Sequence, residues 1–217
     1  SIRASGAPAE AVTADVTSEA DMNLLVDRAS QVFGRVDVMV CNAGFGYYGT
    51  VEDTPPDVMR RMMEVNFIGT YLGARAVLPL FRRQGSGHLL IVSSIVGRRG
   101  IAQMSGYSAT KAAQIGFAES LRAEFAGTNI HVSVVLPVST ETEFRTAMER
   151  DYGHNVSGLG PKQSAADVAR AMLACIHRPR AEVYPHAASR ALTILNATAP
   201  GLTDRVVRRY GLRRTTR

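Results

Sequence analysis

The residue types and spacing that point most directly to chemistry are those of Ser94, Tyr107 and Lys111. Tyr107 and Lys111 are four residues apart in a segment that predicts a helix, so their side chains would lie on one face, a turn apart. A phenol with its ordinary pKa of about 10 is a poor acid or base at neutral pH, but a fixed ammonium beside it favours the phenolate and lowers that pKa. Ser94 follows an apolar run, where its hydroxyl could donate a hydrogen bond to the oxygen on which Tyr107 acts.

The alternative for this pair is a solvated helix face, which is the commoner context of a tyrosine and a lysine four residues apart. The serine at the end of an expected buried strand changes that balance. Three such groups at a strand end and a helix start favour acid–base catalysis.

Short apolar runs typical of strands alternate along the chain with longer segments that have helical spacing. The expected strands are residues 11–16, 36–41, 88–92, 130–136 and 181–184, and the expected helices are residues 18–34, 56–83, 105–126 and 164–177. Thr17 or Ser18 would cap the first helix, with Gly34 as its stop, and Ser164 with Asp167 would cap the last.

The run at 130–136 has almost no polar face, which is typical of strands covered by helices on both sides. The alternation therefore predicts an α/β fold with a doubly wound, mostly parallel sheet. We expect a single domain over residues 1–217, in which residues 138–163 form a substrate lid.

In a parallel sheet, ligands bind beyond the carboxyl ends of the strands. The residues expected there are Asp15, Asn42, Ala43, Gly44, Ser93, Ser94 and the segment from Pro137 onward. Four of these residues have a simpler interpretation, because Asp15 can cap a helix and residues 42–44 can be an ordinary turn. No G-x-G-x-x-G turn follows a strand near the start of the chain.

Four separated motifs resemble those of the short-chain dehydrogenases/reductases, in the same order and over about residues 11–144. They are Asn42-Ala43-Gly44 after a strand, Asn66 in EVNFIG, Ser94 thirteen residues before Tyr107, and the YSATK segment at 107–111. The resemblance implies a Rossmann-like, NAD(P)-dependent oxidoreductase that transfers a hydride between a nicotinamide and a carbonyl or secondary alcohol.

The same resemblance assigns roles to four residues. Tyr107 matches the catalytic acid/base, and Lys111 matches its partner, which also binds the nicotinamide ribose. Ser94 matches the serine that positions the substrate. Asn66 matches the asparagine that supports a water in the proton relay.

Cofactor contacts are also implied by the resemblance. They fall on Asp15, Asn42, Ala43, Gly44, Tyr107, Lys111, Pro137, Thr140 and Thr142. Asp15 resembles the aspartate that contacts the adenine, and Thr142 the threonine that bonds the carboxamide, with Thr140 as the alternative. Val138 stands where the family usually has a glycine, so the backbone there is expected to approach the nicotinamide less closely. NADP is slightly favoured over NAD by analogy with reductive members.

The family's first strand, its glycine-rich turn and the helix after it have no counterpart before residue 11. They would need roughly 40–60 residues and would place the pyrophosphate on a helix N-terminus. The sheet is therefore expected to be incomplete at its N-terminal side. The alternative function that follows is a non-catalytic remnant or scaffold that keeps the site residues but cannot hold the dinucleotide.

Several side chains suit either a substrate pocket or simple packing. The apolar candidates are Phe45, Tyr47, Tyr48, Met104, Val138, Phe144 and Met148. Arg98 and Arg99 would attract an anionic substrate or would lie in an exposed turn. The five histidines show no ligand spacing that indicates a metal, and the absence of a G-x-S-x-G motif disfavours a serine hydrolase.

The net charge of +6 lies in the last thirteen residues, which hold six arginines and no acid. The rest of the chain is balanced, so nucleic-acid binding is not indicated. We expect residues 205–217 to be a solvated basic tail, with contact to a membrane surface as the less favoured alternative. The absence of a leader and the two cysteines, Cys41 and Cys175, favour the cytoplasm. By resemblance, the helices at 56–83 and 105–126 would form a homodimer or homotetramer.

Overall fold

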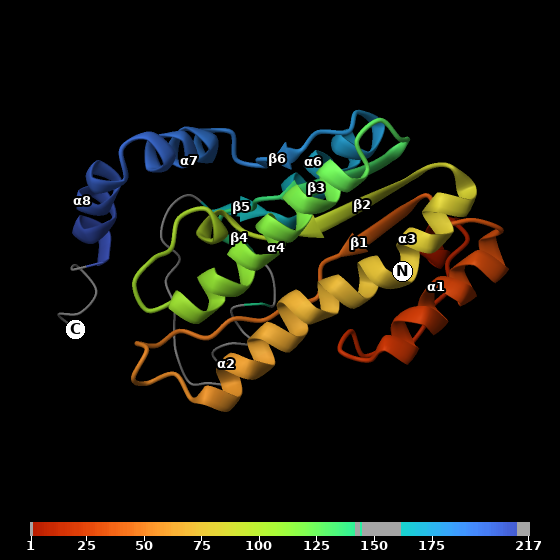
Figure 1. The fold of residues 1–217 in the computed structure, drawn as a ribbon, viewed down its shortest axis with the longest axis horizontal. Helices are drawn as coiled ribbons and strands as arrows, with labels where there is room; N and C mark the ends of the chain where they lie inside the picture. Colours follow the sequence, from red (N-terminus) through yellow and green to blue (C-terminus); the bar gives the residue numbers. More distant parts are fainter. Residues whose placement is uncertain (1, 142–143, 145–161, 212–217) are drawn as a thin grey trace.

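The central feature of the protein is a parallel sheet, seen in Figure 1 in a computed structural model that describes residues 2–141, 144 and 162–211. The strands of this sheet, in spatial order, are β1 (Val38–Cys41), β2 (Gly87–Val92), β3 (Ile130–Val135) and β6 (Glu182–Val183). All three neighbouring pairs are parallel. A second, two-stranded sheet joins β4 (Thr140–Glu141) to β5 (Gln163–Ser164), which the sequence did not predict.

From residue 19 to residue 183, helical regions alternate with the strands of the parallel sheet, as the sequence predicts. They are α1 (Glu19–Phe33), α2 (Pro56–Met63), α3 (Gly69–Gln84), α4 (Ser105–Glu124), α6 (Ala165–His177), α7 (Ala188–Thr198) and α8 (Pro200–Gly211). Three short helical segments are η1 (Arg3–Ser5), η2 (Glu64–Ile68) and η3 (Ile95–Gly97). Within the described part, none of these helices is both long enough and apolar enough to cross a membrane.

Helices cover both faces of the sheet. On β2, Leu89 and Ile91 pack into a core with α1, α3 and α4, while Leu90, between them, packs with Cys175 of α6. All three β2 side chains are fully buried. The two-sided burial confirms the doubly wound α/β fold.

The expected helix caps are confirmed at two helices. Ser18 precedes α1, and its hydroxyl accepts a hydrogen bond from the Asp21 amide; Gly34 ends the helix with a φ of 79°. Ser164 and Asp167 form a reciprocal capping box at the start of α6. Of the two candidates for the first cap, the structure selects Ser18.

The predicted strand at residues 11–16 is wrong, because this segment pairs with none of the described strands. The Asp15 amide instead donates to the Asp21 carboxylate (2.8 Å), and its carbonyl accepts from the Ser18 amide (3.0 Å). Val16 packs against α3, where a β-carbon on Gly69 would lie 2.9 Å from the Val16 side chain. The segment is held by the start of α1 and by α3.

Two further differences concern helices. The single helix predicted for residues 56–83 is divided by the π-helical turn η2. The C-terminal helices α7 and α8 were not expected, and the predicted basic tail is helical from Arg205 to Gly211, whereas residues 212–217 lie outside the described part.

Gly87 is required by the packing of a neighbouring aromatic ring. A β-carbon there would lie 2.1 Å from the ring of Phe81, which is fully buried. We expect Gly87→Ala to lower the free energy of unfolding in urea by about 1–3 kcal/mol, because the ring has no space to move.

A matched control is Gly116→Ala on α4, where a β-carbon would meet nothing within 4 Å. This variant should match the parent or gain up to about 1 kcal/mol, since alanine favours a helix. Equal stability of the two variants would contradict the packing argument.

Candidate active site

The predicted site residues meet at the carboxyl edge of the sheet. The turn at 42–44 follows β1, Ser94 follows β2, and Pro137 follows β3. The first two turns of α4 carry Tyr107 and Lys111 to the same edge. This is the edge at which parallel sheets bind ligands.

Tyr107 and Lys111 lie on a buried face of α4, which excludes the solvated alternative. Their exposed fractions are 9% and 3%. The Lys111 Nζ lies 5.6 Å from the centroid of the Tyr107 ring and donates a hydrogen bond of 2.9 Å to the Val92 carbonyl at the end of β2. The helical spacing therefore brings the amine and the phenol together, as the sequence predicts.

Burial controls the protonation of both groups. It raises the pKa of Tyr107, and a hydrogen bond with Ser94 acts in the opposite direction. It lowers the pKa of Lys111 to about 7, because an ammonium is costly to remove from water. The expected lowering of the Tyr107 pKa by Lys111 is not found here: removal from water is the largest effect on this pKa, and the phenol is the stable form at neutral pH.

Ser94 is held where the ends of β2 and β3 meet. Its hydroxyl caps η3 by accepting from the Val96 amide (3.3 Å) and lies 3.4 Å from the Pro137 carbonyl. The Ile95 amide donates to the same carbonyl at 3.0 Å. The turn that carries Ser94 is thus fixed to the residue that follows β3.

Asn66, fully buried in η2, joins the turn after β1 to α4. Its side-chain oxygen accepts from the Phe45 amide and its nitrogen donates to the Phe45 carbonyl, both at 2.9 Å. The same nitrogen donates to the Thr110 hydroxyl (2.9 Å), which donates in turn to the Tyr107 carbonyl (2.8 Å). These contacts make Asn66 a positioning residue, and its role in a water relay stays a prediction.

Gly44 brings the backbone of the β1 turn close to these groups. A β-carbon on it would lie 2.9 Å from the Asn66 Oδ1 and 3.6 Å from the Lys111 Nζ. Residues 42–44 are exposed. An exposed turn this close to the buried amine suits a ligand that must reach both.

The sequence did not predict the positioning roles of several residues. The Ser93 hydroxyl donates to the Lys111 carbonyl (2.8 Å), and the fully buried Gln114 donates to the Asn66 carbonyl (2.7 Å). A β-carbon on Gly97 would lie 2.7 Å from the Lys111 carbonyl carbon, so η3 touches α4 directly. A signal was present: positions 107, 110, 111 and 114 are polar and share one helix face by their spacing.

The other predicted cofactor residues are only partly placed. The exposed Asp15 accepts from the Thr17 amide (2.9 Å) and hydroxyl (2.8 Å), and these bonds lower the pKa of its carboxyl. This is a local turn at the start of α1, and it leaves a ligand role open. Thr140 lies in β4 and donates to the Val138 carbonyl (3.0 Å). Thr142, Met148 and most of the predicted lid lie outside the described residues.

The surroundings of Tyr107 are apolar. Its cluster contains Met62, Met104, Phe45, Tyr47, Tyr48, Met59, Val96, Ile101 and Phe144. The rings of Phe144 and Tyr107 lie 5.7 Å apart between centroids. Five of the apolar candidates from the sequence therefore gather around the phenol, whereas Val138 is not part of this cluster.

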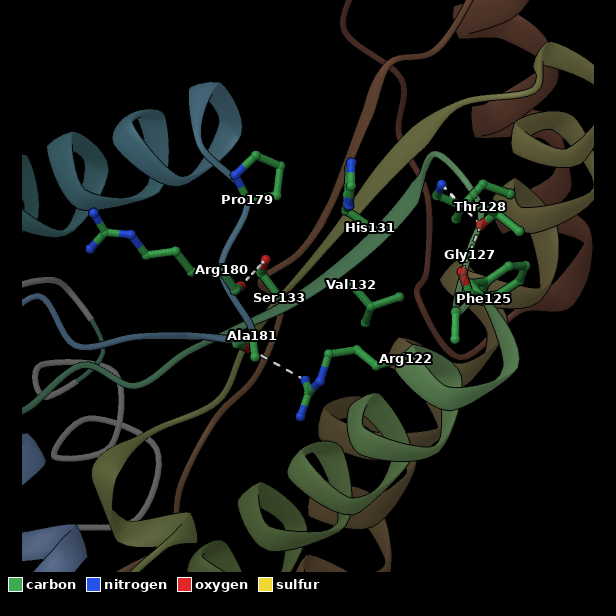
Figure 2. A pocket seen from close by; sticks show the side chains of 12 residues that line it. Arg122, Phe125, Gly127, Thr128, His131, Val132, Ser133, Pro179, Arg180 and Ala181 are labelled. Carbon is green, nitrogen blue, oxygen red and sulfur yellow. Dashed lines mark hydrogen bonds between the residues drawn. The ribbon is translucent and has the colours of Figure 1, made fainter.

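A pocket of about 260 Å³ lies at the opposite end of β3 (Figure 2). It is formed by the end of α4, the first residues of β3 and residues 179–181. Arg122 donates to the Ala181 carbonyl (3.4 Å), and Ser133 donates to the Arg180 carbonyl (2.5 Å). These bonds hold its walls together at a distance from Tyr107, and we assign it no part in the reaction.

Residues 1–153 match the family model for short chain dehydrogenases. The chain belongs to the short-chain dehydrogenase family. It is 33% identical over 201 residues to dehydrogenase/reductase SDR family member 7B of Mus musculus, covering 90% of this chain and 62% of that protein. It is 27% identical to the ketoacyl reductase HetN of a Nostoc species, covering 97% of this chain and 75% of HetN. The chain thus spans about three fifths of the length of the first of these relatives.

Solved structures of short-chain dehydrogenases have the same fold. A protein from Burkholderia phymatum in complex with NAD superimposes with a TM-score of 0.80 at 25% identity, covering 93% of this chain and 79% of that one. A protein from Burkholderia cenocepacia in complex with NADP gives a TM-score of 0.75 at 27% identity, covering 90% and 77%.

The depressed pKa of Lys111 can be measured directly, because the chain has only two lysines, Lys111 and Lys162. With lysine labelled with ¹³C at Cε, we expect one NMR signal to titrate at about pH 7. The variant Lys111→Met should lose that signal. A Lys111 signal that titrates only above about pH 10 would show that burial does not disfavour the ammonium.

Proposed function

We propose that the protein is an NAD(P)-dependent oxidoreductase that interconverts a carbonyl compound and a secondary alcohol. The observation that carries this proposal is the contact of Tyr107 with Ser94 and Lys111 at the carboxyl edge of the sheet. The family and the nicotinamide complexes of its structural neighbours support it.

When bound, the nicotinamide supplies or accepts the hydride at the substrate carbon. Tyr107 donates its phenolic proton to the substrate oxygen during reduction and takes the hydroxyl proton during oxidation. Ser94 donates a hydrogen bond to the same oxygen. Once Tyr107 has given its proton to the substrate oxygen, the ammonium form of Lys111 stabilises the phenolate that remains in the buried site.

We propose that the cofactor lies along the strand ends. Lys111 would bind the nicotinamide ribose, since its bond to Val92 uses one of the three donors of an ammonium. Residues 42–44 and Asp15 would pass beside the adenine half, and Pro137 with Thr140 or Thr142 beside the carboxamide. The slight preference for NADP rests on analogy alone.

The substrate is proposed to be uncharged and apolar near its carbonyl. The methionines and aromatic rings around Tyr107 support this, because such side chains adapt to apolar ligands. Arg98 and Arg99, which would otherwise attract an anion, are paired with carboxylates of Glu119 and Asp204. The alternative of an anionic substrate is thereby weakened.

A homodimer or homotetramer through residues 56–83, which form α2, η2 and α3, and residues 105–126, which contain α4, is the proposed assembly. Phe67 of η2 and Tyr71 of α3 both pack edge-on against Phe117 of α4, with ring centroids 6.0 and 6.1 Å apart. Tyr71 is 39% exposed. An aromatic patch that spans both helices supports their use as an interface.

The decisive variant is Tyr107→Phe, which removes the proton donor and keeps the ring. Turnover of a ketone with NAD(P)H should fall by at least about 1000-fold, while the circular dichroism spectrum stays that of the parent. The control is Tyr71→Phe on α3, which should keep full activity. Carbonyl turnover at the parent rate in Tyr107→Phe would overturn the mechanism.

The non-catalytic alternative is tested by cofactor binding. NADPH and NADH are titrated into the 217-residue chain, with binding followed by nicotinamide fluorescence. Dissociation constants in the micromolar range are expected from the proposed function. A folded chain that binds neither cofactor at millimolar concentration would favour the scaffold.

A further inference from the structure

The turn that carries Ser94 is held by hydrogen bonds and ion pairs with side chains that lie far away in the sequence. This turn runs from Ser94 through η3 to Arg99. Within it, the Gly97 amide donates to the Ser94 carbonyl and the Arg99 amide donates to the Ile95 carbonyl, both at 3.0 Å. A change in the position of Arg99 is therefore transmitted to Ser94 through these hydrogen bonds.

The first set of contacts comes from the C-terminal helices α7 and α8. The Arg99 guanidinium pairs with Asp204 of α8 (2.6 Å) and donates to the Asn196 side chain of α7 (3.4 Å). The Asn196 amide nitrogen donates back to the Arg98 carbonyl (3.1 Å). Figure 1 shows α7 and α8 at the end of the molecule that also holds the segment between β2 and α4.

The second set of contacts comes from α4 and from strand β6 of the sheet. The Arg98 guanidinium pairs with Glu119 of α4 (2.6 Å) and with Glu182 of β6. Glu182 also accepts a hydrogen bond from the Tyr184 hydroxyl (2.6 Å). The two adjacent arginines thus attach the turn to different parts of the chain. The Arg98 side chain binds α4 and β6, and the Arg99 side chain binds α7 and α8.

The pairing with α8 is more than a solvated surface contact. The Arg99 side chain is 21% exposed, although Asp204 is 64% exposed. Thr203, the neighbour of Asp204, is fully buried, so this turn of α8 is packed and not solvated. A guanidinium that is largely removed from water needs a partner in a defined position.

We propose that Asn196 and Asp204, on α7 and α8, are positioning residues that hold the Ser94 turn in its catalytic geometry through Arg98 and Arg99. The proposal rests on the proposed function, in which Ser94 contacts the substrate oxygen and Tyr107. It gives the C-terminal helices a part in the reaction although they contribute no group to it.

The direct test is hydrogen exchange of the amides at 95–99 in the variant Asp204→Asn, which keeps the shape and removes the charge. Exchange should become about fivefold faster at these amides, while the midpoint of global unfolding stays that of the parent. Asp204→Glu should restore slow exchange. Unchanged exchange at 95–99 in Asp204→Asn overturns the proposal.

The matched control is Glu19→Gln, which breaks the ion pair of Arg75 and Glu19 (2.8 Å) at a distance from the turn. Both side chains of this pair are more than half exposed. This variant should leave exchange at 95–99 unchanged. Equal acceleration in the control would show a general loosening of the fold and would also overturn the proposal.

A second readout separates positioning from simple support. The hydrogen bond with Ser94 lowers the pKa of Tyr107, so a displaced Ser94 lets that pKa rise. Among the described residues, the other titratable groups that face Tyr107 are Lys111 on α4 and Tyr47 and Tyr48 after β1, and none is altered by the variant. The acidic limb of kcat for alcohol oxidation should therefore move to higher pH in Asp204→Asn.

The two tests fail in different ways. Faster exchange with an unmoved acidic limb would make α7 and α8 a mere support and would overturn the positioning role. A parent protein that oxidises no alcohol and reduces no carbonyl compound would overturn the proposed function. Hydrogen exchange would then still decide whether α8 holds the turn, because it needs no cofactor.

Discussion

The site depends on a row of polar side chains that one face of α4 carries into the interior. Buried polar groups must find partners, and here the partners are the strand ends and η2: Lys111 bonds the last residue of β2, while Thr110 and Gln114 bond Asn66. Satisfying these groups fixes how α4 lies across the sheet. The same contacts place Tyr107 beside Ser94, so the packing of the helix and the geometry of the candidate catalytic groups have one cause.

The spacing of Tyr107 and Lys111 could be predicted from the sequence, whereas their burial could not. The four-residue interval places Tyr107 and Lys111 on one face in any helix, so their proximity follows from the sequence. Their exposure does not, because it depends on what packs over α4. Removal from water raises the pKa of the phenol and lowers that of the amine. Electrostatic reasoning from the sequence therefore chose the right pair of residues and the wrong dominant effect.

The fold was predictable where the signal is local. The cap at Ser18, the capping box at Ser164 and the apolar runs of β2 and β3 all act within a few residues. Residues 11–16 have a strand-like pattern, but a strand also needs a neighbour to pair with, which no local pattern supplies. The helices α7 and α8 were missed for the same reason, since their position depends on contacts with Arg99, about a hundred residues away.

The π-helical turn η2 limits insertions and deletions at this place in the chain. One additional residue per turn offsets the two flanking helices by about 100° around their common axis. With this offset, Met59 and Met62 of α2 face Gly106 near the phenol, while Phe81 of α3 faces the sheet core. Deleting a single residue between 64 and 68 would rotate either the α2 methionines or the Phe81 ring of α3 away from its neighbours. Insertions and deletions are therefore far less tolerable there than point substitutions.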